Sequence, residues 1–206
     1  MKIRLSLFVT LLLAIGTAHA EPGYYGNPAY YPPMPDYQQE TPATLLEDGI
    51  KRIQVFIKQK GIKDPEVLTA FLNEQMAPYF DFDYMASLVG GRYYEQLDPS
   101  LRVQFKTRLQ KMFFSALSRN LGAYTDPMPR IDFMRQPRFR SYNDVEVAAR
   151  VLPVNGYPIR LIFRFARTND GWKVYDASYN GMSAVMYYRK YFMEQARRYG
   201  TQAFLD

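Results

Sequence analysis

The chain has 206 residues, of which 48% are hydrophobic, and it contains no cysteine and a single histidine, His19. Without cysteine the chain can form no disulfide, no thiolate nucleophile and no thiolate metal site. Because His19 lies in a predicted signal peptide, the mature protein keeps no histidine for serine–histidine, cysteine–histidine or zinc mechanisms. The 26 Lys+Arg against 20 Asp+Glu suit brief contact with an anionic membrane surface or an acidic partner, but fall short of a nucleic-acid-binding composition.

The first twenty residues are typical of a secretory signal peptide. Lys2 and Arg4 form a positive start, Leu5 to Ile15 is an apolar run, and Ala18-His19-Ala20 is a small-x-small cleavage sequence. The apolar run is too short to cross a bilayer, which takes roughly 20 residues. We therefore expect cleavage after Ala20 and a soluble exported protein without a lipid anchor. Removal of Lys2 and Arg4 leaves 24 basic and 20 acidic residues, a net charge of +4.

Residues 21–41, "EPGYYGNPAYYPPMPDYQQET", form a Tyr/Pro-rich leader. The segment shows no periodicity and holds too little apolar surface to order itself, so we expect a disordered leader with extended conformers. A peptide ligand for a partner is the alternative interpretation. The rest of the chain, 42–206, suits a single domain.

The first half of this domain has the apolar spacing of helices. Gly61 is the expected end of the first helix, and Asp64-Pro65-Glu66 is an N-cap followed by proline at the first helical position. The second helix is expected to end at Pro78. Phe80 to Gly91 predicts a short helix capped near Asp81 or Asp83, and Asp98-Pro99 begins another. The apolar positions of the first, second and last of these helices are Leu46, Ile50, Ile53 and Ile57; Val67, Leu68, Phe71, Leu72 and Met76; and Leu101, Phe105, Leu109, Phe113 and Leu117.

From Ile131 onward the apolar period becomes two, which predicts about four antiparallel strands. Ile131 to Arg140 is the first strand, and the turns Asn155-Gly156 and Asn169-Asp170-Gly171 separate the later ones. From Ser183 the period is again helical. The expected class is α+β, with helices that cover one face of a curved, roughly four-stranded antiparallel sheet. The alternating strand positions are Val145, Val147, Ala149 and Val151, then Ile159, Leu161, Phe163 and Phe165, and then Trp172 and Val174.

The helical faces carry more large side chains than a small core needs. Phe113-Phe114, Tyr93-Tyr94, Tyr187-Tyr188 and Tyr191-Phe192 are examples, and the chain has ten methionines. Helices laid over a curved sheet leave a wedge between the layers. Apolar side chains either fill that wedge or line it for a guest. The composition alone leaves both possibilities open.

Two stretches resemble one family. "FDFDYMASLVGGRYYEQLDPSLRVQFKTRLQKMF" and "GWKVYDASYNGMSAVMYYRKYF" are similar to segments of the MlaC/toluene-tolerance family of periplasmic phospholipid-binding proteins. The second stretch resembles the family's Trp-Lys-Val-x-Asp strand, its Gly-x-Ser bend and its following helix. Two features depart from the family pattern: the Tyr/Pro-rich leader, and the corner Ala177-Ser178-Tyr179-Asn180, where relatives usually carry branched apolar residues and an acid.

The resemblance implies a carrier that is a component of an ABC transport system and maintains outer-membrane lipid asymmetry. It would act in the periplasm as a monomer that shuttles a glycerophospholipid between an outer-membrane lipoprotein/porin complex and an inner-membrane ABC transporter. The bound phospholipid would be its cargo, and no cofactor is expected. The protein would come close to a membrane only transiently and would not bind nucleic acid. Two tails of about fifteen methylenes each represent ~24 kcal/mol of gross transfer free energy, so release requires a partner that opens the cavity. The chain has no phosphate-binding loop of its own.

We expect three roles for particular residues of this chain. Arg92, Arg164 and Arg189 are headgroup candidates, with solvated or ion-paired surface arginines as the alternative. Asp176, Gly181 and Ser183 are structural: Ser183 is an expected N-cap, and Asp176 is expected to accept hydrogen bonds from backbone N–H groups or an arginine. The expected tail-lining residues, for which plain core is the alternative, are Phe82, Met85, Leu88, Phe113, Leu117, Val147, Val151, Leu161, Phe163, Val174, Met182, Val185 and Met186.

Two other functions stay open. The expected fold, helices on a curved sheet that enclose an apolar cavity, is like the cone of nuclear transport factors. Such cones can host enzymes that use an aspartate base and tyrosine donors inside the cavity, and Asp176 with Tyr175, Tyr179 or Tyr187 imitates that arrangement. A third possibility is an adaptor that binds protein partners through the leader and the sheet. We expect no catalytic activity and no metal.

Overall fold

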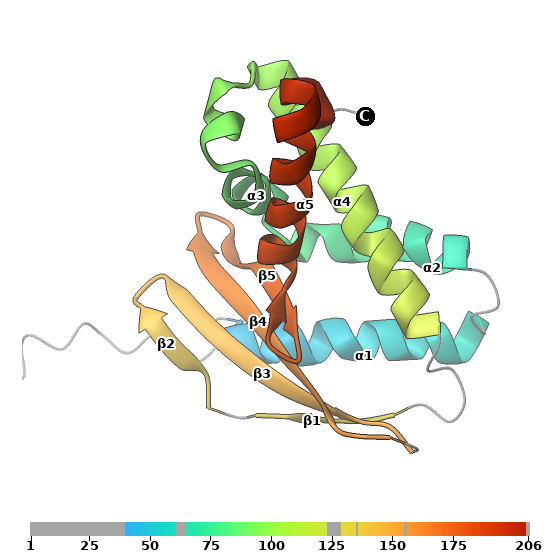
Figure 1. Ribbon diagram of the computed structural model, residues 1–206. Coiled ribbons are helices and arrows are strands. Elements are labelled where there is room, and N and C mark those ends of the chain that lie inside the picture. Colours follow the sequence, from blue (N-terminus) through green and yellow to red (C-terminus); the bar gives the residue numbers. More distant parts are fainter. Residues whose placement is uncertain (1–39, 61–64, 123–128, 135, 155, 205–206) are drawn as a thin grey trace, which may run out of the picture. The chain divides into compact units, whose positions relative to one another are not determined.

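A computed structural model describes residues 40–60, 65–122, 129–134, 136–154 and 156–204 (Figure 1). All of these belong to the second of two units in the chain, Gln38–Asp206. The expected signal peptide and nearly all of the leader lie outside the described residues, as do Gly61, Asp64 and Asn155.

Two helical runs open the unit. Helix α1 spans Pro42–Lys60, as its apolar spacing predicts. Helix α2 spans Pro65–Phe71 and continues as a π-helix, η2, over Leu72–Met76 and a 3₁₀-helix, η3, over Ala77–Tyr79. The prediction that this run ends at Pro78 was therefore wrong by one residue, because a 3₁₀ turn accepts proline near its start. Of its expected apolar face, Leu68, Leu72 and Met76 are buried, whereas Val67 is exposed.

Helices α3 and α4 follow. Helix α3 spans Phe82–Gln96, and the Asp81 side chain caps it by accepting the Tyr84 N–H at 2.8 Å. It extends beyond the predicted end at Gly91, which forms a kink at φ 48° instead. Helix α4 spans Pro99–Gly122 and begins at the predicted Asp98-Pro99 signal.

One antiparallel sheet of six strands occupies the second half. Strands β1 (Arg130–Phe133) and β2 (Arg138–Ser141) both pair with β3 (Asp144–Leu152), which pairs with β4 (Ile159–Thr168). Strand β5 (Gly171–Tyr179) pairs with β4 and with the short β6 (Met182–Ser183). The expected single strand Ile131–Arg140 is thus two strands, β1 and β2, and this split together with β6 raises the expected four strands to six among the described residues.

Helix α5, Ala184–Tyr199, leaves the sheet edge and ends in a 3₁₀ turn, η4, over Gly200–Phe204. The side chain of Phe204 is fully buried, 4.8 Å by ring centroid from Phe105 and stacked on Phe192 at 5.7 Å. No apolar periodicity in this part of the sequence indicates that Phe204 is buried, and its position in the core was not predicted.

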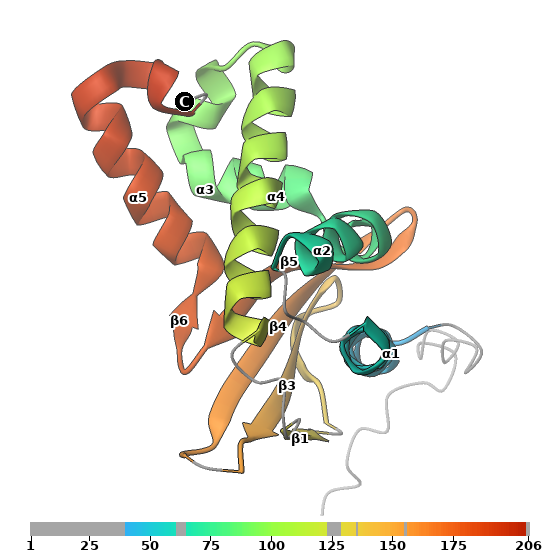
Figure 2. The same cartoon turned by 90° about the vertical axis from the view of Figure 1, so that its right-hand side faces the viewer.

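The unit holds two apolar cores. The larger lies among α2, α3, α4, α5 and η4, and the smaller lies between α1 and the sheet, around Leu46, Val145, Val147, Phe165 and Val174. Figure 2 views α1 end-on, apart from the other helices and beside the sheet. Phe80 contacts both cores. Helix α1 therefore covers one sheet face, and it also contacts α2, since the rings of Phe56 and Phe71 stack at 4.0 Å.

Candidate functional site

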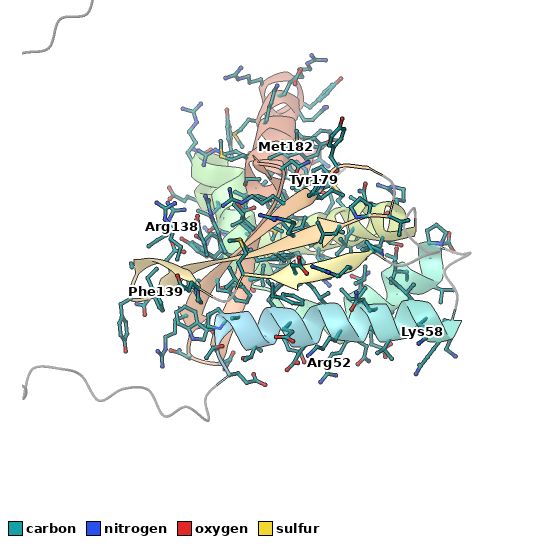
Figure 3. All side chains as sticks on the ribbon, turned by 90° about the horizontal axis from the view of Figure 1, so that it is seen from below. Arg52, Lys58, Arg138, Phe139, Tyr179 and Met182 are labelled. Carbon is teal, nitrogen blue, oxygen red and sulfur yellow. The ribbon has the colours of Figure 1, made fainter. Side chains whose placement is uncertain are left out.

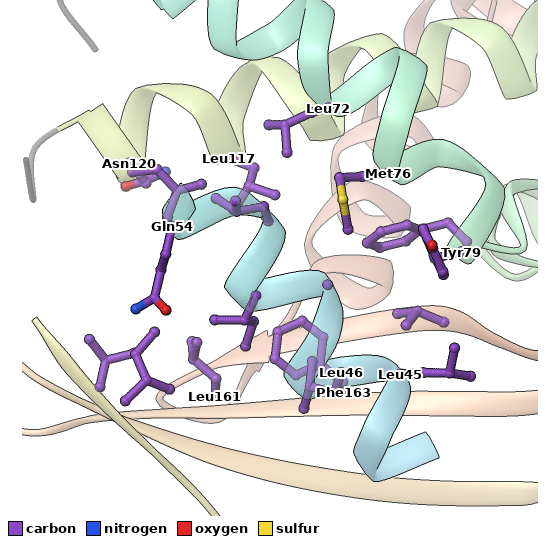
Figure 4. Close-up of a pocket in the computed structure, with 18 of the residues that line it drawn as sticks. Leu45, Leu46, Gln54, Leu72, Met76, Tyr79, Leu117, Asn120, Leu161 and Phe163 are labelled. Carbon is purple, nitrogen blue, oxygen red and sulfur yellow. The ribbon is translucent and has the colours of Figure 1, made fainter. Parts of the chain in front are cut away.

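An apolar cavity of about 220 Å³ lies between α1, the sheet, the η2–η3 run and the end of α4 (Figure 4). Gln54 and Asn120 lie at one end, and Leu45 and Tyr79 lie at the other. Hydrocarbon side chains form almost all of the wall between these ends. The lining residues are Leu45, Leu46, Gly49, Ile50, Ile53, Gln54, Ile57, Leu72, Met76, Tyr79, Phe80, Phe114, Leu117, Asn120, Leu121, Pro129, Ile131, Val151, Ile159, Leu161, Phe163, Phe165, Trp172, Val174 and Tyr179.

Helix α1 supplies one wall because its apolar residues recur at helical spacing. Gly49 belongs to this face, and a Cβ added there would lie 3.1 Å from Met76 Cε. The glycine therefore permits Met76 to approach the helix. The sequence predicted this apolar face of the helix but did not assign it to the lipid site. The unbroken apolar stripe was the signal from which such an assignment could have been made.

The sheet supplies the opposite wall through period-two alternation. Ile159, Leu161, Phe163 and Phe165 of β4 all line the cavity, since every second side chain of a strand points to the same face. The neighbouring strand adds Trp172 and Val174 at its start. The cavity thus follows the length of β4.

The expected tail-lining residues divide into three groups. Leu117, Val151, Leu161, Phe163 and Val174 line the cavity together. Phe82, Met85, Phe113 and Val185 are buried in the larger helical core, with Leu88 packed against it, and Val147 is buried between α1 and the sheet. Met182 and Met186 are 66% and 63% exposed.

The exposure of the two methionines follows from the direction of α5. Its buried residues Val185, Tyr188 and Phe192 form one face toward the other helices, and Met186 lies off that face. Met182 opposes Tyr179 across the last turn of the sheet, where Figure 3 shows the two side chains close together. Both methionines therefore lie outside this cavity.

The three headgroup candidates do not line it either. Arg164 ion-pairs with Glu146 at 3.1 Å and with Asp176 at 3.6 Å. Arg189 donates to the Leu88 carbonyl at 3.1 Å, and the guanidinium carbon of Arg92 lies 5.2 Å from the centre of the Tyr93 ring. Each thus has a local partner elsewhere in the unit.

The corner between sheet and α5 is built as expected. Asp176 is 1% exposed and accepts hydrogen bonds from Ser183 Oγ at 2.7 Å and from the Val185 backbone N–H at 3.1 Å. Ser183 caps α5 by accepting the Met186 N–H at 3.1 Å. Gly181 has φ 86°, a conformation that favours glycine. A structural role for Asp176, Gly181 and Ser183 stays a prediction, and these contacts support it.

The tyrosines that could serve an enzyme are scattered. Tyr175 donates its hydroxyl to Asp144 at 3.0 Å, and burial together with this hydrogen bond raises the pKa of Tyr175. Tyr187 is exposed, whereas Tyr179 lines the cavity. Asp176 opposes Arg164, which opposes Glu146, and this row lies on the sheet face opposite the cavity because residues alternate.

Among the described residues, no cluster of three or more acidic, histidine or cysteine side chains could hold a metal ion. Within the same residues, no helix is long and apolar enough to cross a membrane.

Three comparisons with known proteins relate this chain to MlaC and to phospholipid-binding proteins. The family model described as "MlaC protein" matches residues 49–206. A curated relative from Haemophilus influenzae, the intermembrane phospholipid transport system binding protein MlaC, is 26% identical over 153 residues, 71% of each chain. A solved phospholipid-binding protein from Ralstonia solanacearum, in complex with a phospholipid, matches with a TM-score of 0.66 and 22% identity over 78% of this chain and 90% of that one. The chain belongs to the MlaC family.

Proposed function

We propose that the protein is a phospholipid carrier that holds acyl chains in the cavity between α1 and the sheet. The observation that carries this proposal is the cavity itself, a continuous hydrocarbon surface bounded by two layers and flanked by few polar groups. Burial of acyl-chain methylenes against an apolar surface of this kind is favourable, by roughly 0.8 kcal/mol of transfer free energy for each CH₂. The curated relative named for intermembrane phospholipid transport and the fold shared with a phospholipid complex support the same assignment.

The carrier works in the periplasm, between an outer-membrane complex and an inner-membrane ABC transporter. The predicted signal peptide supports export, and the relative's name supports transport between membranes. The large transfer free energy of two tails means that loading and unloading take place at partners that open the cavity. The protein therefore binds and carries without changing its cargo.

Lipid extraction and mass spectrometry of the purified protein test the proposal. We expect close to one phospholipid per chain. Ile50→Trp fills the cavity from α1 and should lower this ratio, whereas Val55→Trp, on the exposed side of the same helix, should not. Protein that is free of lipid after gentle purification from cells, or equal loading of both variants, contradicts the proposal.

A further inference from the structure

The apolar row of β4 ends in a positive charge. Ile159, Leu161, Phe163 and Phe165 line the cavity, and the next position on the same face is Arg167. Arg167 lies opposite Trp172 in the β4–β5 register, and Trp172 also lines the cavity. A cation thus follows directly after the hydrocarbon wall.

Two aromatic rings hold the Arg167 guanidinium. Its central carbon lies 5.8 Å from the centre of the Tyr142 ring and 5.7 Å from that of Trp172. Among the described residues, no ion pair includes Arg167. Rings attract the face of a guanidinium and leave the N–H donors at its edge available to an acceptor. Arg167 is therefore exposed, held in position and without a carboxylate partner in this part of the chain.

A second cavity, of about 470 Å³, surrounds this end of the sheet. Polar and charged residues make up just over half of its lining, and it shares Leu45, Tyr79 and Trp172 with the apolar cavity, so the two adjoin. Its charged residues are two cations and two carboxylates: Glu40, Arg167, Asp170 and Lys173. Lys173 and Asp170 approach each other at 3.7 Å, which leaves Arg167 as the cation with donors to spare.

We propose that the polar cavity is the headgroup site of the carrier, in which Arg167 donates hydrogen bonds to the lipid phosphate. This inference rests on the proposed function. An amphiphile needs a polar site beside the apolar one, and arginine matches two phosphate oxygens with its paired donors. The balanced charges of the cavity suit a zwitterionic headgroup, because a second negative charge would face Glu40 and Asp170. Arg167 thus takes the role for which the sequence had suggested Arg92, Arg164 and Arg189.

The chain supplies its own probe. Trp172 is the only tryptophan and lines both cavities, so its fluorescence reports occupancy. Delipidated protein is titrated with dihexanoyl phosphatidylethanolamine, with dihexanoylglycerol, which has the same tails and no phosphate, and with glycerophosphoethanolamine, which has the headgroup and no tails. The variants are Arg167→Gln and, as a control, Arg160→Gln, an exposed arginine on the same strand and the opposite face. Urea unfolding checks that each variant is folded. Arg167→Lys serves as the conservative variant at the same position.

We expect Arg167→Gln to weaken phosphatidylethanolamine binding by about ten- to a hundredfold and to leave dihexanoylglycerol binding unchanged, whereas Arg160→Gln changes neither. Equal weakening of both two-tailed probes overturns the proposal, because Arg167 would then only support the wall. Unchanged phosphatidylethanolamine binding also overturns it. If glycerophosphoethanolamine binds as tightly as the full lipid, the cavity is a site for free phosphodiesters, and the proposal of a lipid headgroup site is overturned. A wild-type protein that binds neither two-tailed probe contradicts the proposed function itself.

Discussion

The carboxylate of Asp176 joins the sheet to the start of α5, because its Oδ1 accepts the backbone N–H of Val185 at 3.1 Å. Val185 is the first buried residue of the helix, so this bond fixes where the helix begins to pack. The other oxygen accepts Ser183 Oγ and faces Arg164 at 3.6 Å. The acid is thus satisfied on all sides, as a buried carboxylate must be.

Replacement of Asp176 should cost stability in graded steps. Asp176→Ala leaves the buried Val185 N–H without its acceptor and removes one of the two carboxylates that face Arg164, and we expect a loss of about 3 kcal/mol in the free energy of unfolding. Asp176→Asn keeps one acceptor oxygen and should lose less, and Ser183→Ala should lose about 1 kcal/mol as a missing N-cap. Urea unfolding measures all three. Equal stability of Asp176→Ala and wild type would show that the bond contributes nothing.

The turn between β5 and β6 should tolerate only certain residues at position 181. Asn180 and Gly181 have φ 46° and 86°, the signs of a type I′ turn. Nothing lies within 4 Å of a Cβ added at Gly181, so Gly181→Ala should cost only the backbone strain, about 1–2 kcal/mol. Gly181→Asn should cost less, since asparagine adopts this conformation more readily. A larger loss for asparagine than for alanine, in urea unfolding, would contradict this explanation.

The sequence predicted the elements of the fold better than the contents of its site. Periodicity located α1, α4, β3, β4 and α5, because each buries one face. It could not say what each face meets: Ile50 and Ile53 form a cavity wall, whereas Phe113 fills a core of helices. The Asn180-Gly181 pair is the same hairpin signal as Asn155-Gly156, but the helical period that begins at Ser183 follows so closely that no strand is predicted after it.

The corner shows why that turn matters. The reversal at Asn180 adds β6 to the sheet edge, where Met182 and Ser183 pair with Tyr179 and Ser178 of β5. The turn is held to β4, since the Asn180 N–H donates to the Arg160 carbonyl at 2.8 Å and the Asn180 side chain accepts the Arg160 N–H at 2.9 Å. Helix α5 therefore starts at the edge strand and packs on the other helices. Met182 and Met186, expected in the pocket, are exposed for this reason.

Stability should fall in alkali. Burial raises the pKa of Tyr188 to about 12, whereas a tyrosine in an unfolded chain ionises near pKa 10. The unfolded state therefore loses its proton first, and the stability present below pH 10 is lost as the pH rises toward 12. Unfolding midpoints in urea across this range should decline less steeply in Tyr188→Phe than in Tyr199→Phe, a change at an exposed tyrosine of the same helix. Parallel curves for the two variants would contradict the assignment.

Loading should move α1 away from the sheet. The cavity volume of about 220 Å³ lies below the roughly 300–1,000 Å³ of ordinary ligand pockets, and two acyl chains need more. Helix α1 is the wall that we expect to yield, because the buried residues of the larger core come from other elements and α1 contacts that core through the partly buried Ile53 and Phe56. The cysteine-free chain permits spin labels at Val55→Cys on α1, Val103→Cys on α4 and Arg150→Cys on β3, all of which are exposed positions. The 55–150 distance should lengthen when phospholipid binds, while the 103–150 distance stays constant. Lengthening of both would show instead that the sheet moves against all the helices.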